Sequence, residues 1–165
     1  MGLGSEGLHT NGYSLARKVL AGSGLRLEDR LPGGAGETLG GALLTPHRWY
    51  GQALMPAIER GQLRALAHVT GGGIAGNLVR VLAEGSRAAV DLRAWPRPPL
   101  FRWLIEVGGV PEDDARQAFN LGIGMIVVCA PTAAPALVTD LERAGERVWP
   151  IGEVIAGPRG VTWKE

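Results

Sequence analysis

The stretch that decides the fold reads Ala65-Leu66-Ala67-His68-Val69-Thr70-Gly71-Gly72-Gly73-Ile74-Ala75-Gly76-Asn77. Its first residues are apolar, as in a short buried strand, and three consecutive glycines follow before a helical segment begins. Glycine lacks a Cβ atom, so such a turn can adopt positive φ and approach another group closely. The stretch therefore predicts a strand, a tight turn and a helix in direct succession.

The glycine turn has several possible roles. Gly71, Gly73 and Gly76 spell G-x-G-x-x-G after a strand, a pattern typical of dinucleotide binding. The pattern lies in mid-chain, however, and too few strand–helix units follow it to build a doubly wound dinucleotide-binding sheet. Two interpretations stay open. The turn either serves the fold alone, or its helix-terminal amides bind a phosphate or another polar group of a substrate.

Composition and charge exclude several classes of protein. The 165 residues carry a net charge of +1, so no strong field attracts nucleic acid or an anionic membrane. No apolar run reaches the roughly eighteen residues of a membrane helix. The single cysteine, Cys129, fits an inert core position in a reducing compartment, and the three histidines, in unrelated contexts, show no metal-ligand spacing. We therefore expect a single soluble, cytoplasmic domain over residues 1–165, with no metal site.

Periodicity together with glycine and proline signals predicts an α/β domain in which helices flank a mixed sheet. The Thr45-Pro46 pair is typical of a helix start, and Thr10 or Asn11 is expected to cap the first helix. Residues 1–9, rich in glycine, are an unusual beginning for a domain. The predicted helices are 13–20, 45–61, 74–82, 98–107, a short one from 111, and 132–144; the predicted strands are 63–69, 88–92, 123–130, 148–155 and 161–163.

Other candidate site residues lie outside the glycine turn. The run H-T-N-G-Y-S (9–14) precedes a helix, where it either caps that helix or cradles a phosphate. His68 ends a strand at the sheet edge where ligands often bind, so a core role and a functional role are both open. Asn120 enters a buried strand beside two glycines, which indicates close packing or another wall of a ligand cleft. His47 is expected at the surface.

Seven stretches occur in an order that resembles one family. They include H-T-N-G-Y-S-L (9–15), L-T-P-H-R-W-Y (44–50), A-H-V-T-G-G-G (67–73), W-P-R-P-P-L-F-R-W-L (95–104) and F-N-L-G-I-G-M (119–125). The series is similar to the C-terminal half of the phosphoribosylformylglycinamidine cyclo-ligases, also called aminoimidazole ribonucleotide synthetases. One departure is Ile74-Ala75-Gly76, where that family tends to carry a bulkier residue and an acid.

The resemblance implies part of a ligase of de novo purine biosynthesis. Such an enzyme uses ATP and Mg to cyclise formylglycinamidine ribonucleotide to 5-aminoimidazole ribonucleotide, releasing ADP and phosphate. It also implies a layered, partly ferredoxin-like α/β fold for a C-terminal domain whose N-terminal partner binds ATP and Mg and forms the homodimer. Residues 1–165 would then be a fragment, inactive alone. Two alternatives are a domain of the related formylglycinamidine ribonucleotide synthetase and a non-catalytic unit that docks on a partner domain.

By the same resemblance, the candidate site is one wall of a cleft between two domains. The substrate or its phosphate would be bound by Asn11, Gly12 and Ser14 together with Gly71, Gly72 and Gly73. His68, Thr70 and Asn77 would contact the polar edge of the substrate, with Asn120 nearby. Either His68 or His9 would shuttle a proton during ring closure, since an unperturbed imidazole titrates near pH 6.5.

Overall fold

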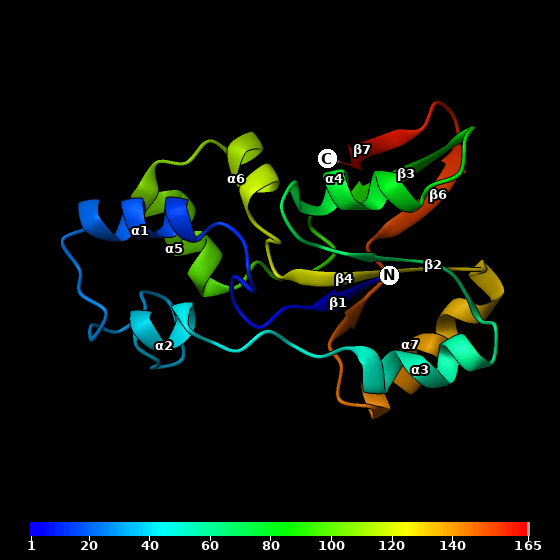
Figure 1. Ribbon diagram of the computed structural model, residues 1–165, viewed down its shortest axis with the longest axis horizontal. Coiled ribbons are helices and arrows are strands. Elements are labelled where there is room, and N and C mark those ends of the chain that lie inside the picture. Colours follow the sequence, from blue (N-terminus) through cyan, green and yellow to red (C-terminus); the bar gives the residue numbers. More distant parts are fainter. Residues whose placement is uncertain (165) are drawn as a thin grey trace.

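The computed structural model describes residues 1–164, and in that range the strands form two sheets. The first sheet has four strands in the spatial order β2-β4-β1-β5, with every neighbouring pair antiparallel. It crosses the middle of the molecule (Figure 1). Its strands are β1 (Gly2–Gly4), β2 (Leu63–His68), β4 (Ile123–Cys129) and β5 (Val148–Trp149).

Two helices cover one face of this sheet. Helix α3 (Gly51–Glu59) precedes β2, and helix α7 (Ala134–Arg143) connects β4 to β5. Both lie below the sheet in Figure 1 and bury an apolar layer against it that includes Leu3, Leu54 and Val127. Four antiparallel strands with the first strand inside the sheet, and two helices packed on one face, correspond to the ferredoxin-like βαββαβ plan. The predicted partly ferredoxin-like α/β class is confirmed.

The opposite face of the first sheet is covered by a short helix and by the second sheet. Helix α4 (Gly73–Leu78) follows β2 through the glycine turn and continues into the 3-10 turn η1 (Val79–Val81). The second sheet has the order β6-β3-β7, with β3 antiparallel to β6 and parallel to β7. The core between these layers contains Ile74, Ile126 and Ile151. The strands are β3 (Ser86–Asp91), β6 (Gly152–Ala156) and β7 (Gly160–Lys164).

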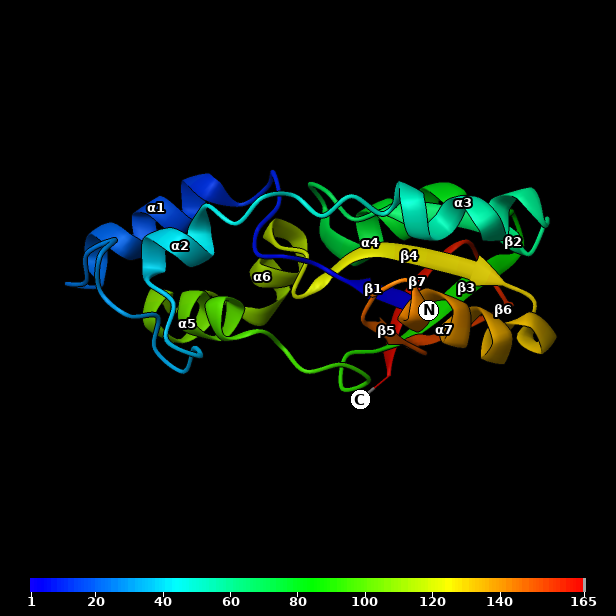
Figure 2. The ribbon, with the colours of Figure 1, turned by 90° about the horizontal axis from the view of Figure 1, so that it is seen from below.

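The remaining helices form a separate end of the molecule beyond the sheets. Seen from below, this helical end lies at the left of an elongated outline (Figure 2). Its core is built around Phe101, Trp103 and Phe119. The helices are α1 (Tyr13–Gly22), α2 (Leu39–Leu43), α5 (Pro99–Gly108) and α6 (Glu112–Ala118); the 3-10 turn η2 (Pro131–Ala133) precedes α7. Within residues 1–164, the structure contains no helix whose length and apolar character suffice to cross a membrane.

Several predicted elements need correction. Residues 2–4, expected to lack regular structure, form β1, and Leu3 is completely buried between β4 and β5. The helix expected from Thr45 begins only at Gly51, and the side chains of Arg48 and Tyr50 just before it bond to other segments of the chain. Residues 148–155 divide at Pro150 into strands of different sheets. Helix α1 is capped by Gly12, and neither Thr10 nor Asn11 caps it.

Candidate functional site

All three histidines of the chain meet at one place. His9 lies in the loop after β1, His47 in the loop before α3, and His68 at the end of β2. The Nε2 atoms of His47 and His68 are 3.1 Å apart, and the rings of His9 and His47 stack with centroids 3.9 Å apart. The expectation that the histidines occupy unrelated contexts is therefore wrong. We call this group the histidine cluster.

His9 forms the buried wall of the histidine cluster. Its side chain is only 4% exposed, its φ of 58° lies in the left-handed region, and its Nε2 accepts a 3.1 Å hydrogen bond from the amide of Glu6. Its Nδ1 has no hydrogen-bond partner among residues 1–164. A Cβ at position 124 would lie 2.5 Å from the His9 ring and 2.1 Å from the hydroxyl of Tyr50, so only Gly124 lets β4 approach these rings.

Ion pairs hold the loop that carries His47. The guanidinium of Arg48 donates to Glu146 at 2.7 Å, to Glu6 at 3.1 Å and to the Gly145 carbonyl at 2.7 Å. The buried hydroxyl of Tyr50 donates to the carbonyl of Gly4 at 2.8 Å. These bonds join the loop to β1 and to the segment before β5. They place His47 beside His68 although its own ring is exposed.

Burial and the proximity of neighbouring imidazoles favour the neutral forms of His9 and His68. Burial, and then the proximity of His47 and His68, lowers the pKa of His9 to about 4. The pKa of His68 is also lowered, first by partial burial and then by His47. Neutral imidazoles accept protons or bind metal ions, whereas they offer no positive charge to a phosphate. Proton transfer near neutral pH suits the exposed His68 better than the buried His9.

The glycine turn packs closely against α6. The amide of Gly72 donates to the carbonyl of Gln117 and the amide of Gly73 donates to that of Thr70, both at 3.1 Å. A Cβ on Gly73 would lie 1.8 Å from the Arg116 carbonyl oxygen. Two of the amides expected to bind phosphate are thus already paired, and the helix that follows has only six residues. Close packing explains Gly73, and a φ of 91° in the left-handed region explains Gly72.

Asn77 and Thr70 close the glycine turn from inside. The Asn77 amide nitrogen donates to the carbonyls of Thr70, Gly71 and Gly73, at 3.2, 3.2 and 2.8 Å. Its Oδ1 accepts a 3.0 Å bond from the Thr70 hydroxyl. Because Asn77 is buried and bonded in this way, it stabilises the turn, and any contact to a substrate would require some of these bonds to open.

Asn120 has a similar structural role at the start of β4. Its Oδ1 accepts bonds from the Ser5 hydroxyl at 2.7 Å and from the amide of Gly122 at 2.9 Å. Its Nδ2 donates to the Gly7 carbonyl at 3.0 Å. The Asn120 side chain is buried. It joins the loop after β1, which carries His9, to the start of β4.

The two motif loops touch each other. A Cβ on Gly71 would lie 3.4 Å from Oδ1 of Asn11, so the H-T-N-G loop and the exposed glycine turn are neighbours. Ser14 is exposed, whereas Gly12 is needed because a Cβ there would lie 2.5 Å from the ring of Phe119. The structure thus brings Asn11 and Gly71 together. Separately, it gathers the three histidines in the histidine cluster.

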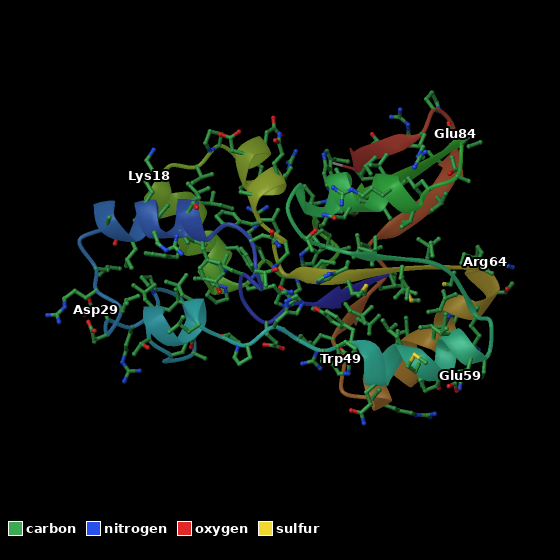
Figure 3. The ribbon with its side chains drawn as sticks, in the orientation of Figure 1. Lys18, Asp29, Trp49, Glu59, Arg64 and Glu84 are labelled. Carbon is green, nitrogen blue, oxygen red and sulfur yellow. The ribbon has the colours of Figure 1, made fainter. Side chains whose placement is uncertain are left out.

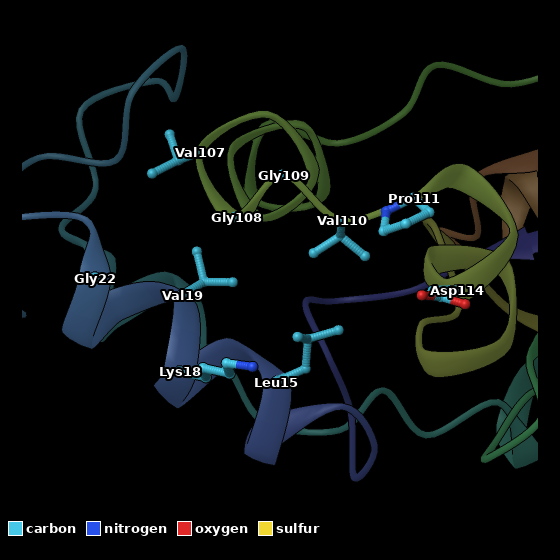
Figure 4. A pocket seen from close by; sticks show the side chains of 10 residues that line it. All are labelled: Leu15, Lys18, Val19, Gly22, Val107, Gly108, Gly109, Val110, Pro111 and Asp114. Carbon is cyan, nitrogen blue, oxygen red and sulfur yellow. The ribbon is translucent and has the colours of Figure 1, made fainter.

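Two grooves of the molecule lie away from the candidate site. One of about 360 Å³ lies between α1 and the turn after α5 and is lined by Lys18, Val19 and Asp114 among others (Figure 4). Another of about 410 Å³ lies between the sheets and is lined mainly by apolar residues such as Ile126 and Val154. Neither includes a predicted site residue. Within the candidate site, His47, His68, Ser14 and Gly71 are exposed, whereas His9, Asn77 and Asn120 are buried.

Sequence reasoning placed His47, Arg48 and Tyr50 in a motif of the resemblance but gave them no role in the site. The run H-R-W-Y (47–50) holds several chemically distinctive side chains. The Thr45-Pro46 pair, however, predicted that this run would lie within a helix. Trp49 in this run is 80% exposed and labelled in Figure 3. Only the folded chain shows that this loop meets β2.

Comparison with known proteins identifies the family. Residues 1–164 match the family model described as AIR synthase related protein, C-terminal domain. The chain belongs to this family. It is 42% identical over 164 residues to a chloroplastic phosphoribosylformylglycinamidine cyclo-ligase of Arabidopsis thaliana, covering 99% of this chain and 42% of that protein. The enzyme of the same name from Burkholderia multivorans is 43% identical over 160 residues, covering 97% and 45%.

The chain spans less than half the length of these curated relatives. Among solved structures, thiamine-monophosphate kinase from Stenotrophomonas maltophilia superposes with a TM-score of 0.62 at 20% identity, covering 98% of this chain and 49% of that one. The hydrogenase maturation protein HypE of E. coli gives 0.59 at 17% identity, covering 98% and 45%. At such low identity these structures confirm the fold alone. The resemblance inferred from the sequence motifs is confirmed by the family match.

Proposed function

We propose that this chain is the C-terminal domain of an ATP-dependent ligase that closes the imidazole ring of formylglycinamidine ribonucleotide. The observation that carries the proposal is the 42–43% identity to phosphoribosylformylglycinamidine cyclo-ligases over almost the whole chain. In this reaction ATP phosphorylates the formyl oxygen, an amidine nitrogen attacks the activated carbon, and phosphate leaves. ADP and 5-aminoimidazole ribonucleotide are the other products. The relatives' names favour this reaction over the related amidation of formylglycinamide ribonucleotide.

The residues of the candidate site do not themselves suit Mg²⁺ and ATP. Mg²⁺ prefers oxygen ligands, chiefly carboxylates, whereas the candidate site offers imidazole nitrogens and amide groups. The amides of Gly72 and Gly73 are paired within the protein. We therefore assign ATP and Mg²⁺ to an N-terminal domain of the same enzyme, which would also form the homodimer.

This chain would supply one wall of the substrate cleft. Asn11, Ser14 and Gly71 have accessible atoms, so we place them against the phosphate or the polar edge of the substrate. We assign proton transfer to His68 rather than to His9. The ring of His9 stacks on His47, and the ring of His47 contacts that of His68. Asn77, Asn120 and the paired glycines act by holding these loops in place.

The proposal is tested in a chimera in which residues 1–164 replace the matching half of the Burkholderia multivorans enzyme. We expect ATP-dependent formation of 5-aminoimidazole ribonucleotide with equimolar ADP. Asn11→Ala should raise the KM for the substrate, while Glu84→Ala, at the distant tip before β3, should leave it unchanged. Calorimetry should find little ATP binding to the 165-residue chain alone. A folded, dimeric chimera that forms no product would contradict the proposal.

A second candidate function is docking without catalysis. Large apolar side chains are exposed on α3 and the loop before it: Leu44 is 76% exposed, Trp49 80% and Met55 48%. Exposed apolar side chains of this size commonly mark an interaction surface. An inactive chimera whose halves still associate would favour docking over catalysis.

A further inference from the structure

We propose that the histidine cluster is a binding site for one divalent transition-metal ion of the Zn²⁺ type. His9, His47 and His68 are the only histidines of the chain, and they come from three segments that are well separated in sequence. Each can offer one ring nitrogen, and these nitrogens all lie within 4.8 Å of one another. A folded chain that gathers all its imidazoles at one point presents the three-histidine ligand set of open zinc sites.

The spacing of the two exposed rings suits a shared ion. Zn²⁺ binds histidine nitrogen at about 2.0–2.1 Å in tetrahedral geometry, so two such nitrogens stand about 3.3 Å apart. The Nε2 atoms of His47 and His68 are 3.1 Å apart. Without an ion, one of these two ring nitrogens donates a single hydrogen bond to the other. With an ion, the lone pairs of both nitrogens turn toward the metal. The distance between these two nitrogens then changes by only a few tenths of an ångström.

His9 supplies the third, buried ligand. Its Nδ1 is buried without a hydrogen-bond partner among the described residues, and its ring stacks on His47 with an angle of 18° between the planes. The amide of Glu6 bonds to Nε2, so binding of the metal requires His9 either to give up this bond or to change tautomer and ring orientation. In the neutral ring Nε2 accepts the Glu6 amide and the proton lies on Nδ1, so coordination through either nitrogen gives up the Glu6 bond and puts a metal–nitrogen bond in its place.

The surroundings hold the ligands in place before any ion binds. Arg48 ties the loop of His47 to Glu6 and to the buried Glu146. His68 is fixed by β2, where it is the register partner of Met125 in β4. Ligands held by such supporting bonds bind metal more tightly than ligands on a free loop.

The ligand chemistry selects the kind of ion. Imidazole suits Zn²⁺, Co²⁺, Ni²⁺ and Cu²⁺, whereas Mg²⁺ and Ca²⁺ require oxygen ligands. Three protein ligands leave a fourth tetrahedral position, and it faces solvent because the rings of His47 and His68 are exposed. A water molecule or an oxygen of a bound ligand can take that position. Metal binding is tested without the ring-closing activity, and an ion on His68 would occupy the nitrogen that the proposed proton transfer uses.

Titration of the chelator-treated 165-residue chain with ZnCl₂ tests the proposal. Calorimetry should show one ion per chain, with no heat from MgCl₂ under the same conditions. Co²⁺ should give the visible absorption bands of a four-coordinate site. His47→Ala and His68→Ala should each weaken Zn²⁺ binding about tenfold or more. Both rings are exposed, so these variants are expected to fold.

The matched control is Cys129→Ser, which removes the single thiol of the chain. Cys129 is paired with Leu63 at the opposite end of β2 from His68, so this variant should bind Zn²⁺ as the unchanged protein does. Loss of binding in Cys129→Ser with retention in both histidine variants would overturn the proposal. So would the absence of Zn²⁺ binding to the unchanged chain.

Ring-nitrogen NMR decides the role of His9 separately. Since the chain has three histidines, each ring can be followed individually while Zn²⁺ is added. A coordinated nitrogen shifts strongly, and all three rings should respond at one equivalent of Zn²⁺. A response confined to His47 and His68 would contradict the three-ligand site.

Discussion

Gly73 lies directly against the backbone of Arg116: a Cβ atom on Gly73 would stand 1.8 Å from the carbonyl oxygen of that residue. The φ of Gly73 is also positive, at 63°. This contact joins the turn after β2 to the end of α6, and so joins the sheets to the helical end of the molecule. The glycine turn is therefore a junction in the fold as well as a motif.

We expect Gly73→Ala to lower the free energy of unfolding by about 3 kcal/mol or more, because it combines a backbone clash with an unfavourable φ. Urea denaturation followed by circular dichroism measures the change. Gly76→Ala is the matched control, since a Cβ there meets nothing within 4 Å. Alanine at that helical position should be neutral or stabilising by about 0.5 kcal/mol. Equal stability of the two variants would contradict the packing explanation.

Asn77→Ala should destabilise the protein through the same turn. The Asn77 side chain donates to three carbonyls and accepts from the Thr70 hydroxyl. Its removal leaves buried polar groups without partners, which costs about 2–4 kcal/mol. Thermal and urea unfolding measure the loss. Asn11→Ala, whose side chain is partly exposed and bonds only weakly to Thr10, should change stability by about 0.5 kcal/mol or less. A similar loss in both variants would argue against a structural role specific to Asn77.

Local signals predicted much of this fold correctly. The strands β2 and β4 and the helix α5 follow from apolar runs bounded by glycine or proline, and the structure places them within a residue or two of the prediction. Such signals depend on neighbouring residues alone. The short strand β1 was not predicted, because a glycine-rich segment has little strand propensity of its own. It is ordered by its two neighbours, β4 and β5, which follow more than a hundred residues later.

The candidate site was predicted only in part for the same reason. The motifs H-T-N-G and T-G-G-G could be recognised as loops, and the structure brings Asn11 and Gly71 together. The meeting of His47 with His68 depends on where the loop before α3 crosses the sheet, which no local pattern records. The bonding of Asn77 inside the turn is likewise visible only once the turn is folded.

Arg48→Met should destabilise the protein by about 3 kcal/mol, because it leaves the buried carboxylate of Glu146 without its partner. The loop that carries His47 should also loosen, which the fluorescence of the neighbouring Trp49 can report. Arg26→Met is the control, since Arg26 and Glu28 form an exposed pair that contributes at most about 1 kcal/mol. If Arg48→Met costs no more than Arg26→Met, the ion pairs do not hold this loop.

The buried His9 should make stability depend on pH in a defined window. Its pKa is about 4 in the folded protein against 6.5 when unperturbed, because burial and then His47 and His68 disfavour the charged ring. Between these values the unfolded chain binds more protons than the folded one, so stability is fully present above about pH 6.5 and falls as the pH drops toward 4. The loss from this residue is at most about 3 kcal/mol.

Urea unfolding at pH values from 7.5 to 4.5, with a chelator present, measures this loss. In His9→Asn, the asparagine tolerates the left-handed backbone of that position and does not titrate. This variant should be less stable at pH 7.5 but should lose less stability on acidification. His68 also has a lowered pKa, so His68→Ala should flatten the profile to a smaller extent. Carboxylates such as Glu112, whose pKa is lowered by the hydrogen bond from Arg97, act mainly below this window. Parallel pH profiles for the unchanged protein and His9→Asn would show that His9 is protonated as readily in the folded chain as in the unfolded one.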